Sequence, residues 1–226
     1  MKVTSYGHSC FLVEVMGKKL LFDPYISPNP LAKEIDVSSI QADYILVSHA
    51  HEDHIADVEP IARQTGAKII SNFEIINWYK AKGLDNVHPM NVGGTAEFDF
   101  GMVSLAQAVH SSSFPDGTYG GVAGGFIIES PEGSFYFAGD TGLTTNMQLI
   151  TEFKDLAFAF LPIGGNFTMN TEAAIMASDF INCKTIIGMH YDTFDLIKID
   201  KDEAIEQFSS VQKELILFDI GKTLNL

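Results

Sequence analysis

The sequence predicts an α/β (α+β) fold, a four-layer αββα sandwich in which two mixed β-sheets pack face to face between outer helices. Strand-like and helix-like segments alternate towards both ends of the chain, whereas the middle consists mainly of strand-like segments with short turns. Two strand-rich blocks, each with its own helices, account for this pattern. Hydrophobic residues make up 46% of the 226 residues, enough for a sizeable core, and no linker or compositional shift divides the chain. We expect a single domain spanning residues 1–226.

The first block begins with a predicted β-meander. Three runs are rich in β-branched or aromatic residues and are separated by glycines: 3–6, 10–15 and 19–22. Two further strands are expected at 44–47 and 68–71. Apolar residues at helical spacing predict one helix over 55–66 and another over 73–83, each ending at a glycine.

The middle of the chain predicts antiparallel strands, because the turns between them are too short for a crossover. Four strand-like segments are expected here: 95–100, 102–109, 122–130 and 134–138. Alternation then resumes with three expected helices: 146–153, 174–181 and 204–211. The remaining expected strands are 156–161, 185–188 and 215–218, the last of which should close the chain.

The composition argues against several classes of protein. The formal net charge is −15, and the chain has only 14 Lys and Arg residues. This composition disfavours an extended nucleic-acid-binding surface, which needs clustered basic residues to contact phosphates. Cys10 and Cys183 lack the spacing of a disulfide framework, so a reducing compartment is expected. The N-terminus lacks the apolar core of a signal peptide, and no apolar run is long enough to span a bilayer. We expect a cytoplasmic protein with no membrane partner, and whether it forms a homo-oligomer stays open.

The chemical signal is concentrated in one run, SHAHEDH at residues 48–54, which follows the strand-like segment 44–47. Histidine and aspartate are expensive to bury unless they are paired or bind a metal. Imidazole and carboxylate are also the ligand types that Zn²⁺ and similar divalent ions prefer. The run therefore predicts a metal site.

Three further candidate ligands each lie just past a strand-like segment: His110, Asp140 and His190. Taken alone, each would be interpreted as a turn or surface residue. The run at 48–54 makes a ligand role the better interpretation of all three. A catalytic metal site needs about three protein ligands, and a two-metal site needs more, usually with a bridging carboxylate. Ligands at strand ends and adjoining loops are what a rigid scaffold offers to a shared cleft.

This motif, followed by His110, Asp140 and His190, resembles the ligand set of the metallo-β-lactamase superfamily. Five flanking segments resemble, within it, the metal-dependent hydrolases related to sugar-phosphate lactonases: GHSC at 7–10, DP at 23–24, GDTG at 139–142, PIGG at 162–165 and HY at 190–191. The likeness covers nearly the whole chain. It agrees with the αββα fold that the strand and helix pattern predicts independently.

The resemblance implies a centre with two divalent metal ions. The implied ligands are His49, His51 and His110 on one ion, Asp53, His54 and His190 on the other, and Asp140 bridging both. Diiron relatives that reduce oxygen or nitric oxide typically have Glu where this chain has His51, which favours a hydrolytic zinc-type site. Mn²⁺ and Fe²⁺ in a hydrolytic role remain alternatives, because ligand type alone does not decide the metal.

Asp53 and His8 are the candidate catalytic residues. Asp53 would bind metal and also accept a proton from the attacking water. His8 would contact substrate or donate a hydrogen bond to a developing oxyanion, or it would be a polar residue at a strand turn. Asp23 would fix the tautomer of a ligand imidazole or start a turn. Tyr191 would orient substrate or pack.

The predicted function is a binuclear metal-dependent hydrolase, in which a metal-bridging hydroxide attacks a small ester, lactone or phosphoester. One alternative is a phosphodiesterase or nuclease of the same superfamily, which the acidic composition disfavours. Another is a metal-binding protein without catalysis, which the complete set of ligand positions disfavours. The motifs favour a small-molecule substrate but do not identify it.

Overall fold

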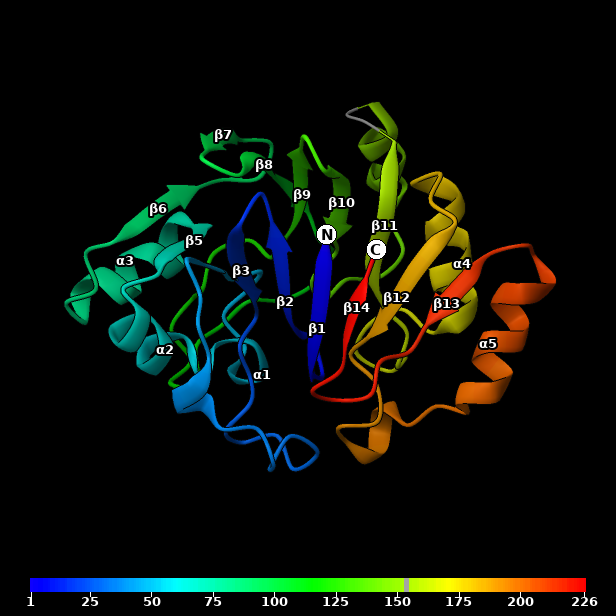
Figure 1. Cartoon of the computed structure of the whole chain (residues 1–226), viewed down its shortest axis with the longest axis horizontal. Helices are drawn as coiled ribbons and strands as arrows, with labels where there is room; N and C mark the ends of the chain where they lie inside the picture. The colour runs from blue at the N-terminus through cyan, green and yellow to red at the C-terminus, as the bar shows by residue number, and fades with distance from the viewer. Residues whose placement is uncertain (153–154) are drawn as a thin grey trace.

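Two seven-stranded β-sheets, stacked face to face with helices on the outside, make up the computed structural model of the chain (Figure 1). The structure describes residues 1–152 and 155–226. The two sheets divide the chain near its middle, except that the last strand returns to the first sheet.

The first sheet is built from both ends of the chain. Its strands, in spatial order, are β14 (Thr223–Asn225), β1 (Lys2–Gly7), β2 (Cys10–Val15), β3 (Lys18–Phe22), β4 (Tyr44–Leu46), β5 (Lys68–Asn72) and β6 (Val87–Met90). Pairing is antiparallel from β14 to β3 and parallel from β3 to β6. Its helices are η1 (Val37–Ser39), α1 (Glu52–Ile55), α2 (Val58–Thr65) and α3 (Phe73–Ala81).

The second sheet runs from antiparallel at one side to parallel at the other. Its strands, in spatial order, are β13 (Glu214–Ile216), β12 (Thr185–Met189), β11 (Leu156–Pro162), β10 (Gly133–Phe137), β9 (Gly124–Ser130), β8 (Gly101–Gln107) and β7 (Thr95–Phe98). Its helices are η2 (Thr145–Glu152), α4 (Thr171–Phe180), η3 (Asp195–Ile197) and α5 (Lys201–Ser210). The antiparallel pairing of β7 to β10, which the short turns predict, is confirmed.

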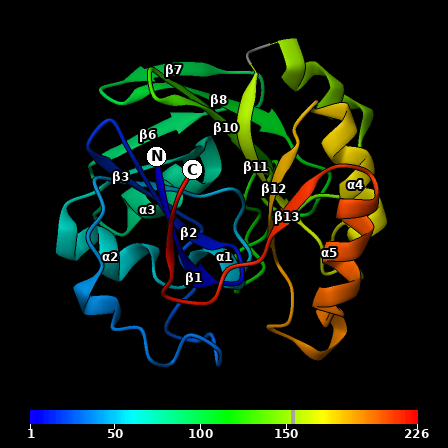
Figure 2. The ribbon, with the colours of Figure 1, turned by 45° about the vertical axis from the view of Figure 1, so that its right-hand side comes forward.

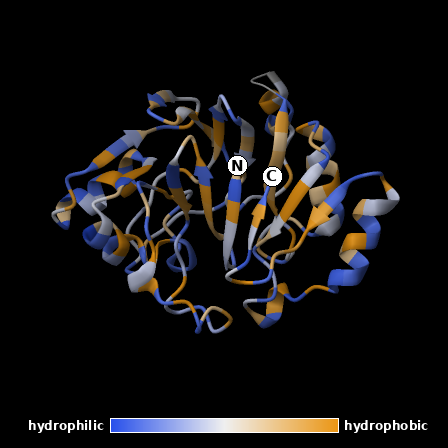
Figure 3. Cartoon of the chain, in the orientation of Figure 1, coloured by the Kyte–Doolittle hydropathy of each residue, from blue (hydrophilic) through white to orange (hydrophobic). Residues whose placement is uncertain are grey.

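Aromatic side chains fill the space between the sheets. Phe22 of β3 stacks on Phe137 of β10 with ring centroids 4.7 Å apart, and Phe11 of β2 lies 4.7 Å from Phe160 of β11. All four rings are buried, and burying each contributes about 1.5–3 kcal/mol to stability. Figure 3 shows the apolar residues gathered along the strands, with hydrophilic residues on the outward sides of the helices.

Helices cover the outer face of each sheet. Ile61 of α2 and Ile76 of α3 belong to the same buried apolar cluster as Ile45 and Ile69 of the first sheet. On the other side, α4 and α5 lie against the second sheet (Figure 2). The predicted four-layer αββα sandwich is therefore confirmed. Among the described residues, no helix combines the length and the apolar character needed to cross a membrane.

Two predicted helices differ from the structure. The single helix predicted over 55–66 is divided into α1 and α2, because Asp57 has non-helical backbone angles. Its carboxylate accepts hydrogen bonds from the backbone N–H groups of Ile26 and Ser27, at 2.6 and 2.9 Å. The helix predicted over 146–153 is the 3₁₀ helix η2, and Phe153 lies outside the described residues.

Two strands have no counterpart in the sequence prediction. β6 is the edge strand of the first sheet and contains Pro89, which removes a backbone donor and weakens the sequence signal. The strand predicted over 215–218 is β13, but it does not close the chain as predicted. The chain continues to the exposed strand β14, whose residues carry no alternating apolar pattern. There Met1 and Leu226 exchange backbone hydrogen bonds of 2.8 and 2.9 Å.

Candidate metal centre

The predicted ligands meet because the strands that precede them point towards the same edge. The run 48–54 leaves β4 and enters α1, while His190 directly follows β12. His110 and Asp140 come three residues after β8 and β10. Since β8, β10 and β12 share one direction, their ends present these side chains together. All of the predicted ligands are brought into one cluster.

Asp140 lies at the middle of this cluster and is buried. Its Oδ2 faces the Nε2 atoms of four imidazoles: His190 at 2.9 Å, His54 at 3.3 Å, His110 at 3.5 Å and His49 at 4.0 Å. No other carboxylate in the described part of the chain has such a set of contacts. This position is the one that a bridging ligand would need.

The first set of donors, which we call the imidazole group, comprises His49, His51 and His110. One ring nitrogen from each lies within 4.8 Å of the others. His49 Nε2 is 3.0 Å from His51 Nδ1, and the other nitrogen of His49 lies 2.9 Å from Ser48 Oγ. Ser48 therefore orients the His49 ring so that Nε2 faces the cluster.

The second set, the mixed group, comprises His8, Asp53, His54 and His190, with donor atoms again within 4.8 Å of one another. Asp53 Oδ2 lies 3.1 Å from His8 Nε2, 3.7 Å from His190 Nε2 and 3.9 Å from His54 Nε2. The other nitrogen of His8 lies 2.9 Å from Thr193 Oγ1. Both nitrogens of His8 thus have partners, which leaves the other three residues as the open donors.

Asp23 is placed as the sequence predicts for a residue that orients a ligand imidazole. Its Oδ2 lies 2.8 Å from His54 Nδ1, so that His54 Nε2 faces the cluster. The same carboxylate accepts hydrogen bonds from Ser48 N at 2.7 Å and Ser48 Oγ at 2.5 Å. Because Ser48 in turn contacts His49, one buried carboxylate orients a donor in each group.

The donor set fits a divalent cation. His54 Nε2 and Asp140 Oδ1 are buried without a hydrogen-bond partner among the described residues. The 3.0 Å approach of two imidazole nitrogens in the imidazole group is also costly when neither carries a proton. A cation shared by these lone pairs removes both costs, and imidazole with carboxylate is a donor set that suits zinc and related ions.

The two groups differ in their pKa values. In the imidazole group, burial lowers the pKa of all three rings. In the mixed group burial acts in the same direction, but the Asp140 carboxylate outweighs it and raises the pKa of His190 to about 9. Asp140 and the neighbouring carboxylates also raise the pKa of His54 well above its usual value. Burial would raise the pKa of Asp140, yet His190 and His54 hold it well below its usual range.

A cavity of about 290 Å³ opens onto the cluster. Its lining residues are His51, Asp53, His110, Ser111, Asp140, Phe167, His190 and Phe194. The Asp53 side chain is 24% exposed and that of Asp140 is 3% exposed. Asp53 is therefore the more accessible of the two carboxylates that line the cavity.

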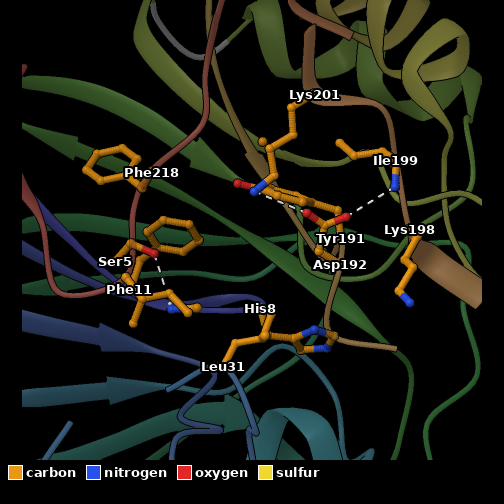
Figure 4. A pocket seen from close by; sticks show the side chains of 13 residues that line it. Ser5, His8, Phe11, Leu31, Tyr191, Asp192, Lys198, Ile199, Lys201 and Phe218 are labelled. Atoms are coloured by element: carbon orange, nitrogen blue, oxygen red, sulfur yellow. Dashed lines mark hydrogen bonds and ion pairs between the residues drawn. The ribbon is translucent and has the colours of Figure 1, made fainter. Parts of the chain in front are cut away.

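Tyr191 does not line this cavity, although it follows His190. It lines a neighbouring cavity of about 410 Å³, where its ring lies 5.4 Å from Lys201 Nζ (Figure 4). Phe11, Phe218 and other apolar side chains surround it there. Tyr191 therefore lies outside the 290 Å³ cavity, although His8 of the mixed group also lines the cavity that contains it.

Several contacts of the cluster have no strong signal in the sequence. Ser111 Oγ lies 3.3 Å from His51 Nε2, and Thr193 Oγ1 contacts His8. Phe194 lies with its ring centroid 5.4 Å from that of His8. Proximity in sequence is the only hint, since each of these residues lies within four positions of a predicted ligand.

Comparisons with known proteins agree with this geometry. A family model described as a beta-lactamase superfamily domain matches residues 2–190. A UPF0173 metal-dependent hydrolase from Flavobacterium johnsoniae is 53% identical over 226 residues, which is 100% of both chains. The solved structure of Igni18, a metallo hydrolase from the hyperthermophilic archaeon Ignicoccus hospitalis, is 38% identical with a TM-score of 0.89, covering 99% of this chain and 97% of that chain.

A more distant solved structure shares the fold alone. The metallo-beta-lactamase fold protein YhfI from Bacillus subtilis is 14% identical with a TM-score of 0.75, covering 99% of this chain and 98% of that chain. The resemblance that the motifs predict is confirmed by the family model and by the full-length relatives. The chain belongs to the metallo-β-lactamase superfamily, among the UPF0173 metal-dependent hydrolases.

Proposed function

We propose that this metal-dependent hydrolase holds two divalent cations, one in each group, and cleaves a small ester, lactone or phosphoester. The observation that carries the proposal is the position of Asp140, whose buried carboxylate faces imidazoles of both groups within 4.0 Å. Zinc is the favoured metal, because most of the donors are imidazole nitrogens. The cations, when bound, would lower the pKa of water to near neutrality and polarise the oxygen of the scissile group.

The side chains would share the remaining tasks. Ester cleavage joins a water oxygen to the acyl carbon and breaks the bond to the leaving alcohol, which takes up one water proton. Asp53 is suited to accept and pass on that proton, because it is the more exposed of the two central carboxylates. Asp140 stays buried and would act as a ligand only.

His8 would act through Asp53 rather than on the substrate. Its side chain has no exposed surface, and its Nε2 lies 3.1 Å from the Asp53 carboxylate. Thr193 holds the opposite side of the ring, so the imidazole has one orientation. His8 thereby keeps Asp53 turned towards the cavity.

Metal analysis coupled to an activity panel tests this function. The full chain, purified without chelator, should carry about two metal ions, the number that a two-metal hydrolytic site requires. Chelation should abolish cleavage of esters, lactones or phosphodiesters, and Zn²⁺, Mn²⁺ or Fe²⁺ added back should restore it to different extents. Fewer than one ion per chain, or activity that survives chelation, would overturn the two-metal mechanism.

The same panel separates the alternatives. A structured RNA and a cyclic nucleotide serve as probes for nuclease or phosphodiesterase activity. Cleavage confined to those probes would favour that alternative. A protein that binds two ions and cleaves none of the probes would be a metal-binding protein without hydrolase activity towards these classes.

A further inference from the structure

Beyond the predicted ligands, the walls of the 290 Å³ cavity offer an apolar surface and no lysine or arginine. Apart from the predicted ligands, the lining consists of Ser111 and the rings of Phe167 and Phe194. None of its described lining residues is Lys or Arg. A substrate group lying away from the cations would therefore meet aromatic carbon rather than a counter-charge.

Backbone contacts fix the turn that carries Phe167, and a ring contact positions Phe194. The turn that carries Phe167 is closed by a 2.9 Å hydrogen bond from Gly165 N to Met169 O, and Met169 N donates to Thr141 O at 3.1 Å, beside Asp140. Phe194 packs its ring against His8, with centroids 5.4 Å apart. Phe167 is nonetheless 52% exposed. An aromatic ring left uncovered at the mouth of a metal cavity is suited to contact a ligand.

Positive charge does occur nearby, but in the neighbouring cavity of about 410 Å³ (Figure 4). There Lys201 Nζ lies 3.1 Å from Asp192, and Lys198 Nζ lies 2.6 Å from Asp195. Each lysine thus already has a carboxylate partner. The two cavities share no lining residue, although His8 of the mixed group lines this one. Neither lysine lines the cavity that Phe167 and Phe194 line.

The size of the metal cavity limits what fits beside the cations. An apolar cavity of roughly 150 Å³ holds one benzene ring. The space of about 290 Å³ therefore accommodates one ring-sized apolar group together with the reacting ester and the cations. A second large group would have to remain in solvent.

We propose that the substrate is an uncharged small ester or lactone whose acyl or ring portion is apolar and about the size of one aromatic ring. That portion lies against Phe167 and Phe194, which makes these two residues the determinants of specificity. The inference rests on the proposed hydrolase function. It separates this site from one that recognises a sugar phosphate, because a remote phosphate would be bound without a cationic partner in an acidic protein.

Three methyl esters test the inference with the zinc-loaded full chain. Methyl benzoate carries the apolar ring, methyl 4-(phosphonooxy)benzoate adds a remote phosphate, and methyl acetate lacks the ring. Methyl benzoate should be cleaved with a kcat/KM at least about 10-fold higher than either of the other two. Equal or faster cleavage of the phosphorylated ester would overturn the inference and leave the hydrolase function standing.

Substitution of the rings gives a second readout. Phe167→Ala and Phe194→Ala should each raise KM for methyl benzoate by about 3- to 10-fold, with a smaller loss for methyl acetate. Phe73→Ala is the matched control, since Phe73 is 53% exposed on α3 and does not line the cavity. A Phe73→Ala loss as large as that of the cavity variants would mean that the rings act through stability alone.

If no ester is cleaved, calorimetry with benzoate tests whether the two rings bind an apolar group. Benzoate should bind to the zinc-loaded chain more tightly than 4-(phosphonooxy)benzoate, and Phe167→Ala or Phe194→Ala should weaken benzoate by about 3- to 10-fold. Ring-dependent binding without cleavage would refute the proposed hydrolysis but support the apolar site. Benzoate binding that does not depend on either ring would overturn the site.

Discussion

The imidazole group and the mixed group face the same carboxylate of Asp140, but the pKa values of the imidazole group are lowered, whereas those of His54 and His190 in the mixed group are raised. The imidazole group contains three neutral donors, two of which, His51 and His110, reach the cavity. The mixed group contains Asp53 as well as the buried rings of His54 and His190. In the proposed two-metal site, each group would hold one cation.

The two groups differ in the pKa values of their imidazoles, because only the mixed group places buried imidazoles beside both Asp53 and Asp140. Buried carboxylates are costly unless they are paired, and in the mixed group Asp53 and Asp140 raise the pKa of His190 and His54. Protons then neutralise the carboxylates whenever a cation does not. In the imidazole group burial lowers the pKa of each ring, so its lone pairs are free at neutral pH. At neutral pH we therefore expect protons to compete with metal at His54 and His190 of the mixed group but not in the imidazole group.

The largest effect is expected for Asp140→Asn, which keeps the shape of the side chain and removes the charge that both groups share. Metal affinity should fall in both groups by more than about 100-fold, beyond the 10- to 100-fold loss typical of an indirect partner. Competition with a chromophoric chelator measures two binding phases, one for the metal ion of each group. Hydrolysis should be lost together with metal affinity. Asp116→Asn, in the exposed loop between β8 and β9, is the control. One phase left at full affinity would show that Asp140 serves a single ion.

The next effect concerns pH. Because the pKa values of His54 and His190 are raised, we expect metal binding in the mixed group to displace protons from these rings. Metal affinity of the mixed group should therefore rise with pH. The proton on His190, whose pKa is about 9, should contribute about a 10-fold loss of affinity for each pH unit below that value. The imidazole group, whose pKa values are lowered, should be insensitive to pH above about 6.5.

Calorimetry in buffers of different ionisation enthalpy counts the protons that metal binding releases. The mixed group should release about two protons at neutral pH and the imidazole group close to none. Equal release from both phases would contradict the difference that we draw between the groups.

Asp23→Asn should weaken both groups by about 10- to 100-fold. The amide nitrogen of Asn cannot accept the hydrogen bonds that the carboxylate takes from Ser48 and from His54 Nδ1. Competition with the chelator measures the loss of metal affinity in each group. Thermal unfolding of the metal-loaded variant checks that the variant folds. A loss confined to one phase would mean that Asp23 orients His54 but not His49.

Ser48→Ala is expected to have the smallest effect, about 10-fold and in the imidazole group only, because its hydroxyl contacts the His49 ring at 2.9 Å. Ser71→Ala is the matched control: Ser71 is equally buried and donates to Val47 O at 2.6 Å, away from any ligand ring. The control should cost about 1 kcal/mol of stability and leave metal affinity unchanged. If Ser48→Ala weakened metal binding equally in both groups, Ser48 would not act on the imidazole group alone.

Much of the fold could be predicted because strands and helices leave local patterns. The run at 156–161 is continuously apolar and the run at 10–15 is apolar except for Glu14, and the structure contains them as β11 and β2. β14 could not be found in this way, since its residues are exposed and it forms only by pairing with β1 at the far end of the chain. The division between α1 and α2 also depends on a distant contact, that of Asp57 with residues 26 and 27.

The kinds of donor atoms, their order and their place at strand ends can be predicted from the sequence, because residue type and strand periodicity are local properties. Three other properties follow from the folded structure: which nitrogen of each ring faces the cluster, in which direction each imidazole pKa shifts, and which rings line the cavity. These properties depend on contacts between residues far apart, such as Asp23 with His54 across 31 positions and His8 with Thr193 across 185. Burial and charge act through space, so a pattern along the chain does not contain them.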